Sequence, residues 1–220
     1  MAWFLRSSAH GMHMVYGQQA SNSCGIACIM MVNFKMKKLN LFSAMAEVPG
    51  GMLGAPLVAF NVADAVKLEK QVYAAYAEVS GGAYDGSADT DGRILPQVLN
   101  KLGIGTWVCE NYKGTDLPAK ISRLVGGKHA APVILLVHWR GDKSGHFVVC
   151  DTVVKSDTGT TADFCDPWDA VVRTVPLTGG SQIIYNVGKV EGLVDLGQSR
   201  NDHGTSKGDM DGWIIHRVAH

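Results

Sequence analysis

The sequence predicts one α+β domain over residues 1–220, with a helical half at about 15–127 and an antiparallel β half at about 130–220. Helical spacing of apolar residues prevails in the first half, whereas short apolar or alternating runs between Gly, Asp and Ser turns prevail in the second. Because the helices precede the sheet, we expect segregated helical and β layers and not a doubly wound sheet. A chain of 220 residues, 46% of them hydrophobic, is long enough to bury a substantial core.

The helical half is expected to contain four helices and one strand. Glycine pairs at 50–51 and 81–82 bracket one helix, and Gly103 closes the next. The last helix of this half has Thr115 as its expected N-cap and a proline in its first turn. The expected helices run from Cys24 to about residue 40, between the two glycine pairs, over 91–103 and over 115–127, and the strand covers 104–110.

The sequence of the β half predicts a meander, in which strands that follow one another in the chain pair as antiparallel neighbours. Its runs "PVILLVHW", "HFVVCDTVV", "ADFCDPW" and "AVVRTVPL" are apolar or alternating, and the turn-forming segments "RGDKSG" and "KSDTGTT" separate the first three. The glycine-rich tail contains one further expected strand, "GWIIHRV". The expected strands are therefore 132–139, 146–154, 162–168, 170–177 and 212–218.

Charge, hydropathy and cysteine content indicate which classes of partner are excluded and which cellular compartment to expect. Twenty basic and twenty acidic residues cancel without blocks of like charge, so neither nucleic acid nor an anionic membrane is indicated as a partner. Arg6 and His10 interrupt the N-terminal apolar residues, so we expect no signal peptide, and "APVILLV" is far shorter than the roughly 20 residues of a membrane helix. Five cysteines without a Cys-x-x-Cys pair favour a reducing compartment. We expect a cytoplasmic protein, or one exported by a route independent of a signal peptide.

Cys24 lies where a polar, turn-prone segment meets an apolar helix, in "QQASNSCGIACIMMVNF". In the first turn of a helix a thiol faces unpaired backbone N–H groups and the positive end of the macrodipole, and both favour the nucleophilic thiolate. The alternative is a small buried residue that fills a gap in the core. For Cys28, four residues later on the same helical face, we prefer this second interpretation.

His146 is the histidine whose setting suits a general base. In "SGHFVVCD" it lies where a glycine turn meets the start of a buried strand, so the sheet can hold the imidazole while its edge faces a cleft. His138, inside "VILLVHW", is interpreted as a strand residue at the edge of the sheet. We interpret four other histidines as structural or surface residues: His10, His13, His203 and His220.

Asp166 is expected to orient His146. It ends the next predicted strand, just before a proline in "FCDPWD", and neighbouring antiparallel strands bring the two side chains together. Asp151 and Asp169 are rivals with less suitable positions. Upstream, Gln18 or its neighbour Gln19 is close enough to Cys24 to donate to an oxyanion together with the cysteine N–H.

These pieces resemble the papain-like cysteine peptidases. The resemblance rests on "QQASNSCGIACIMM", "LPQVLNKLGIGTWV", "APVILLVHW", "GHFVVCD" and "DPW", in that order, and covers roughly residues 15–176. Within the family the chain is similar to the bacterial branch that includes double-glycine leader peptidases and staphopain/avirulence-type proteases, because it lacks the cystine framework of plant and lysosomal members. The resemblance implies Cys24 as nucleophile, His146 as base, Asp166 as the histidine-orienting residue and Gln18 as oxyanion donor.

The implied function is a cysteine endopeptidase that cleaves a protein or peptide substrate through a thioester acyl-enzyme. It requires neither a metal nor an organic cofactor, and an inhibitor or immunity protein is a further expected partner. The same chemistry also serves a papain-fold amidase, a deamidase or a transglutaminase-like toxin, which remain alternatives. A third alternative is a catalytically silent binding module on the same scaffold.

Overall fold

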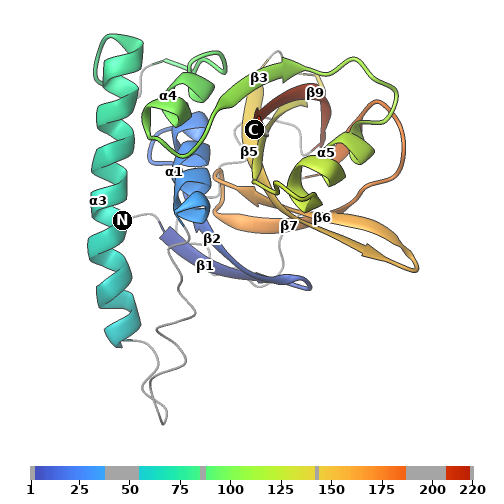
Figure 1. The fold of residues 1–220 in the computed structure, drawn as a ribbon, viewed down its shortest axis with the longest axis horizontal. Helices are drawn as coiled ribbons and strands as arrows, with labels where there is room; N and C mark the ends of the chain where they lie inside the picture. The colour runs from blue at the N-terminus through green and yellow to red at the C-terminus, as the bar shows by residue number, and fades with distance from the viewer. Residues whose placement is uncertain (1–2, 38–54, 85–87, 142–143, 187–206, 219–220) are drawn as a thin grey trace.

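The computed structural model describes residues 3–37, 55–84, 88–141, 144–186 and 207–218. Within them the fold is a mixture of helices and antiparallel sheets (Figure 1). No described helix is both long and apolar enough to cross a membrane. The helices are α1 (Cys24–Met36), α3 (Ala55–Ser80), α4 (Leu95–Lys101) and α5 (Leu117–Gly126).

The main sheet has the strand order β3-β9-β4-β5-β6-β7, and β8 also pairs with β9. Every neighbouring pair is antiparallel, and the segment β4 to β7 is the meander that the sequence predicts. The last strand, β9, lies between β3 and β4, so the strand that comes last in the sequence lies inside the sheet. The strands are β3 (Trp107–Asn111), β4 (Val133–Trp139), β5 (Gly145–Ser156), β6 (Gly159–Asp166), β7 (Val171–Pro176), β8 (Ile183–Asn186) and β9 (Lys207–Arg217).

Helices cover both faces of this sheet. On one face α1 packs against β5, with α3 on its outer side and α4 beside it (Figure 1). On the other face the sheet curves around α5. In β4, Ile134 belongs to the core under α1, whereas Val133 and Leu135 belong to the core under α5. Burial on both faces explains why "VILLV" is continuously apolar and does not alternate with polar residues.

α1 is the central helix of its layer. Ten consecutive residues, 24 to 33, are buried, because the helix is enclosed by α3, α4, β2 and β5. A helix that is apolar all round has to be enclosed in this way. The position of Cys24 is therefore fixed by packing on several sides.

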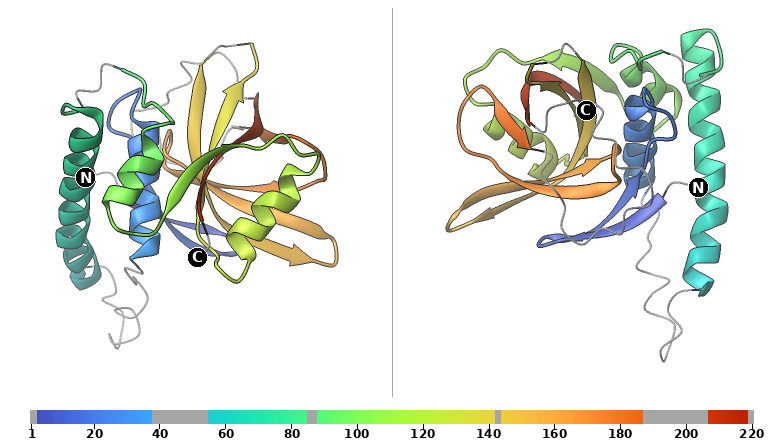
Figure 2. Two further views of the ribbon diagram at one scale, coloured as in Figure 1. Left: turned by 45° about the horizontal axis from the view of Figure 1, so that its top comes forward. Right: turned by 180° about the vertical axis from the view of Figure 1, so that it is seen from behind.

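An N-terminal hairpin that the sequence analysis did not predict precedes α1. Its strands β1 (Trp3–Ser8) and β2 (Gly11–Tyr16) form a separate two-stranded sheet. The hairpin packs against β6, β7 and α1, and the view from behind in Figure 2 shows it below the orange strands. The expected order of helices first and strands second is therefore wrong for this hairpin, whereas β3, between α4 and α5, is the strand expected at 104–110.

Several expected boundaries are also corrected. The N-cap of α5 is Asp116, whose side chain accepts a hydrogen bond from the N–H of Ala119, and not Thr115. The turn expected at 155–161 is shorter, because β5 and β6 pair up to Ser156 and Gly159. β8 was not predicted. His138 is not at a sheet edge, since β4 lies between β9 and β5.

Two of the helix ends expected from glycines are confirmed, and one lies outside the described residues. α3 ends at Ser80, directly before the Gly81–Gly82 pair, and Gly103 follows α4 with a φ of 69° that favours glycine. The glycine pair at 50–51 and the candidate residues His203 and His220 lie outside the described residues.

Candidate active site

Cys24 is the first residue of α1. The N-cap, Ser23, makes no side-chain bond to the helix, because its hydroxyl is bonded to the backbone of Ala20 instead. The N–H groups of the first turn have no intrahelical acceptor, so the helix presents them and the positive end of its dipole to Cys24. The local structure thus has the features that stabilise an anionic sulfur or an anion bound beside it.

Gly25 allows this helix start to pack closely against another segment. A Cβ at Gly25 would lie 2.7 Å from the Cγ2 of Thr90 and 3.1 Å from the Cδ1 of Leu95. Thr90 also donates its hydroxyl to the carbonyl of Asn22 at 2.8 Å. Residues on both sides of Cys24 are therefore held by Thr90, in the segment that leads into α4.

His146, the second residue of β5, connects Cys24 to Asp166. Its Nε2 lies 2.7 Å from Oδ1 of Asp166, and Cys24 is close enough to contribute to the pKa of His146. Burial by itself lowers the pKa of His146, but the charge and hydrogen bond of Asp166, followed by the contribution of Cys24, raise it to about 10. The imidazole is thus held as an imidazolium at neutral pH.

Two tryptophans enclose the His146 ring. The indole of Trp139 is stacked on it at a centroid distance of 5.8 Å and an interplanar angle of 17°. Trp168 meets it edge to face at 5.9 Å. Aromatic faces favour a nearby cation and also exclude water from it. Both rings therefore restrict the orientation of His146 and strengthen its pairing with Asp166.

Asp166 is fully buried and saturated with hydrogen bonds. Oδ1 accepts from the backbone N–H of Trp168 at 2.9 Å as well as from His146. Oδ2 accepts from Arg173 Nη1 at 2.9 Å and from the Tyr185 hydroxyl at 2.7 Å. Burial alone would raise the pKa of Asp166, but the charges of His146 and Arg173 hold it well below its ordinary value. Asp166 therefore stays ionised although it has no access to solvent.

The two rival aspartates make other contacts. Asp169 binds Arg173 with both carboxylate oxygens, and Asp151 pairs with His13 at 2.9 Å. Among the three aspartates weighed from the sequence, His146 is bonded to Asp166. The structure thus pairs His146 with the aspartate that the predicted strand pairing favoured.

Gln18 and Gln19 also differ clearly. Gln18 is buried, its backbone N–H donates to the carbonyl of Pro167 at 2.8 Å, and its side-chain amide donates to the carbonyls of Ala20 and Ser21. Gln19 is exposed and bonds back to Gly17. Gln18 is therefore the buried member of the pair, and in this conformation both hydrogens of its side-chain amide are bonded within the loop that leads to Cys24.

A second buried cluster anchors the N-terminal hairpin to the sheet. Asp163 accepts hydrogen bonds from Ser8 at 2.6 Å and Thr174 at 2.7 Å, and it lies 3.1 Å from Nδ1 of His10. His13 lies between this carboxylate and that of Asp151. Burial lowers the pKa of His13, but the hydrogen bond and charge of Asp151 outweigh this effect and raise it. The cluster thus fixes the segment from which the Gln18 loop departs.

The same cluster contains a donor set of the kind that binds metals. His13, Asp151 and Cys165 offer nitrogen, oxygen and sulfur atoms within 4.8 Å of one another, a combination that suits zinc. However, Asp151 is already bonded to His13, and the ammonium group of Lys35 lies 3.0 Å from its second oxygen. A metal would have to replace these partners, so we interpret the cluster as a structural clamp.

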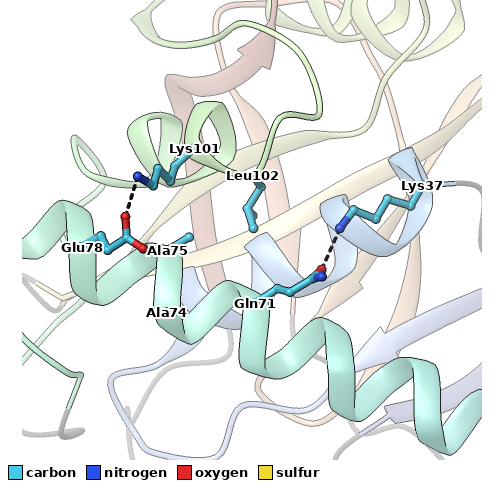
Figure 3. Close-up of a pocket in the computed structure, with 7 residues that line it drawn as sticks. All are labelled: Lys37, Gln71, Ala74, Ala75, Glu78, Lys101 and Leu102. Carbon is cyan, nitrogen blue, oxygen red and sulfur yellow. Dashed lines mark hydrogen bonds and ion pairs between the residues drawn. The ribbon is translucent and has the colours of Figure 1, made fainter.

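A groove between the end of α1, α3 and α4 has a volume of about 310 Å³ (Figure 3). None of the candidate site residues lines it. Its two lysines are paired within the groove, Lys37 with Gln71 at 2.8 Å and Lys101 with Glu78 at 2.5 Å. The groove therefore adds nothing to the chemistry of Cys24.

Three residues that contact His146 or Asp166 were not predicted from the sequence: Trp139, Arg173 and Tyr185. Arg173 had a detectable signal, because it occupies the same alternating phase of its strand as the buried Val171 and Val175. An arginine on the inward phase of a strand needs an anionic partner. No such pattern marks Tyr185.

The sequence matches no known family model and no curated protein at a significant level. The function is therefore inferred from the geometry of Cys24, His146 and Asp166.

Proposed function

We propose that this protein is a papain-like cysteine peptidase in which Cys24 is the nucleophile, His146 the general base and acid, and Asp166 the residue that orients His146. The observation that carries the proposal is the buried chain of contacts from Cys24 through His146 to Asp166, at the start of a helix. A nucleophile, a base within its reach and a third group that orients the base form the arrangement that covalent catalysis requires.

The first chemical step is attack of the Cys24 thiolate on a substrate carbonyl carbon. The imidazolium of His146 stabilises the thiolate beforehand, and the carbonyl oxygen becomes an oxyanion as the carbon–sulfur bond forms. The Cys24 N–H, which lacks an intrahelical acceptor, supports this oxyanion. Gln18 joins it when its amide gives up one of its two loop carbonyls.

His146 then transfers its proton to the leaving amine, and the carbon–nitrogen bond breaks to leave a thioester on Cys24. Neutral His146 next removes a proton from water, which attacks the thioester and releases the acid product with a regenerated thiolate–imidazolium pair. Asp166 does not take the proton in this cycle, because its four hydrogen bonds and the Arg173 charge stabilise its ionised form. Its role is to orient the ring and to stabilise the imidazolium.

The substrate class that we propose is a protein or peptide, and an inhibitor or immunity protein would act at the same site. The test combines hydrolysis of quenched fluorescent peptide libraries with labelling by a papain-type epoxide inhibitor. We expect turnover and a single adduct on Cys24 in the wild type, and neither in Cys24→Ala. Cys109→Ala is the matched control, because it removes another free thiol outside the proposed site. A wild type that forms no adduct on Cys24 would contradict the proposal and favour the silent binding module.

Product mass separates peptide hydrolysis from the alternative reactions of the same acyl-enzyme. Hydrolysis of a peptide bond gives two fragments, deamidation of a glutamine side chain replaces an amide by an acid without chain cleavage, and transamidation joins an added amine. Cleaved peptides would support the peptidase, and either of the other products would assign the amidase or transglutaminase chemistry to the same residues.

Gln18 is tested against its neighbour. If Gln18 supplies oxyanion stabilisation, Gln18→Ala lowers kcat by about 10²–10³-fold, as removal of one oxyanion donor does. The matched variant Gln19→Ala changes it little, because Gln19 is exposed. Equal effects of the two substitutions would contradict the role of Gln18.

A further inference from the structure

We infer that Arg173 and Tyr185 are positioning residues for the proposed reaction, because they hold the Asp166 carboxylate ionised and fixed in the plane that orients His146. The inference deepens the proposed function and rests on it. Neither residue belongs to the motifs around Cys24, His146 and Asp166, and both come from strands later in the chain.

Strand register places Arg173 beside Asp166. Asp166 is paired with Val171 across β6 and β7, and Arg173 is two residues further along β7 on the same face as Val171. A long side chain reaches such a diagonal neighbour. Arg173 Nη1 lies 2.9 Å from Oδ2 of Asp166 and 3.0 Å from Oδ1 of Asp169, so the guanidinium bridges two carboxylates.

Tyr185 approaches the same oxygen from β8. Its hydroxyl donates to Oδ2 of Asp166 at 2.7 Å, and its ring centroid lies 5.9 Å from the Cζ of Arg173. Tyr185 is fully buried in the core under α5. The ring therefore has little freedom, and it holds Arg173 and Asp166 in one fixed arrangement.

The division of partners between the two carboxylate oxygens explains what these residues do. Arg173 and Tyr185 bind Oδ2, whereas His146 and the Trp168 N–H bind Oδ1. A carboxylate anchored at one oxygen cannot rotate, so the other oxygen keeps a fixed direction toward Nε2 of His146. A fixed ring also fixes how His146 is placed relative to Cys24, the other group that raises its pKa.

The second part of the role of Arg173 is that its positive charge keeps Asp166 ionised. A buried carboxylate is protonated readily unless opposite charge surrounds it, and for Asp166 both His146 and Arg173 supply this charge. Arg173 carries its charge at every relevant pH, and Asp169 holds its other side. Arg173 thus keeps Asp166 ionised at acidic pH, and its loss would let Asp166 gain a proton and release His146.

The test measures the pH dependence of Cys24 alkylation by iodoacetamide, followed by mass spectrometry. We expect Arg173→Gln to move the acid side of this profile to higher pH by about one to three units, the shift that an adjacent opposite charge produces. Arg173→Lys should restore part of the shift, and Tyr185→Phe should move the profile in the same direction by less. Arg140→Gln is the matched control, because Arg140 makes a comparable but exposed ion pair with Asp209.

The outcomes separate this inference from the proposed function. If wild-type Cys24 reacts as an ordinary thiol, both are wrong. If wild-type Cys24 is activated but Arg173→Gln only lowers the folded fraction and leaves the acid side in place, Arg173 is structural and this inference alone is wrong. Should Arg173→Gln not fold, Tyr185→Phe decides, because it removes one hydroxyl and keeps the ring; an unshifted profile would overturn the inference.

Discussion

Replacing Asp166 by Asn removes the charge that holds His146 protonated and preserves the shape of the side chain. Burial alone lowers the pKa of His146, but Asp166, with a smaller contribution from Cys24, raises it from 6.5 to about 10. Each pH unit corresponds to about 1.4 kcal/mol, so the folded state gains on the order of 5 kcal/mol by keeping His146 protonated. Because His146 and Asp166 are both buried, solvent screens little of this energy.

The sign of the pH dependence follows from the raised pKa. The stabilisation is complete below pH 6.5, the value of the unfolded chain, and is lost as the pH rises toward about 10. We expect Cys24→Ala to be more stable than Cys24→Ala/Asp166→Asn by several kcal/mol at about pH 6. The difference should shrink by up to about 1.4 kcal/mol per pH unit above 6.5. Both proteins carry Cys24→Ala, so they differ only at position 166, and urea denaturation followed by tryptophan fluorescence measures the free energy of unfolding.

The control is Asp209→Asn in the same background. Asp209 pairs with Arg140 at the surface, where solvent screens the pair, so this substitution should introduce no slope in this pH range. If the difference caused by Asp166→Asn stays constant between about pH 6 and 10, Asp166 does not hold His146 as an imidazolium. The thiolate–imidazolium mechanism would then lose its electrostatic basis.

Two further predictions concern packing and capping. Gly25→Ala should destabilise the protein by about 1–3 kcal/mol, because the added methyl group would lie 2.7 Å from the Cγ2 of Thr90. Gly126→Ala is the control and should not destabilise it, because a Cβ there has no neighbour within 4 Å. A similar loss of stability in both variants would contradict the packing argument. Asp116→Ala should lower the stability by about 0.5–2 kcal/mol, because α5 loses its N-cap, whereas Thr115→Ala should change the thermal denaturation little. A larger loss of stability in Thr115→Ala than in Asp116→Ala would support Thr115, the N-cap predicted from the sequence.

Much of the fold follows from local patterns in the sequence. Glycines and prolines mark the ends of α3, α4 and α5, and period-two or continuously apolar runs mark β4 to β7. The N-terminal hairpin was missed because His13 and Ser8 point to buried partners, so "FLRSSAHGMHMVY" does not read as an amphipathic strand pair. The hairpin depends on tertiary hydrogen bonds to Asp151 and Asp163, which no local pattern contains.

The candidate site likewise combines features that follow from local sequence with features that depend on tertiary contacts. Cys24 and His146 could be found because a helix start and a strand start are local features that orient a thiol and an imidazole. Asp166 could be preferred to Asp151 and Asp169 because the predicted pairing of neighbouring strands brings it beside His146; in the structure β5 pairs with β6 and His146 is bonded to Asp166.

The sequence by itself determined the α+β class, the meander and the positions of Cys24, His146 and Asp166 at the ends of their elements, because these depend on interactions between residues close in the chain. Tertiary structure alone decided the insertion of β9 between β3 and β4, the burial of Gln18 and not Gln19, and the arrival of Arg173 and Tyr185 at Asp166. The physical reason is that a buried carboxylate has to accept hydrogen bonds from nearby donors, and the register between strands that are distant in the sequence determines which donors lie near it.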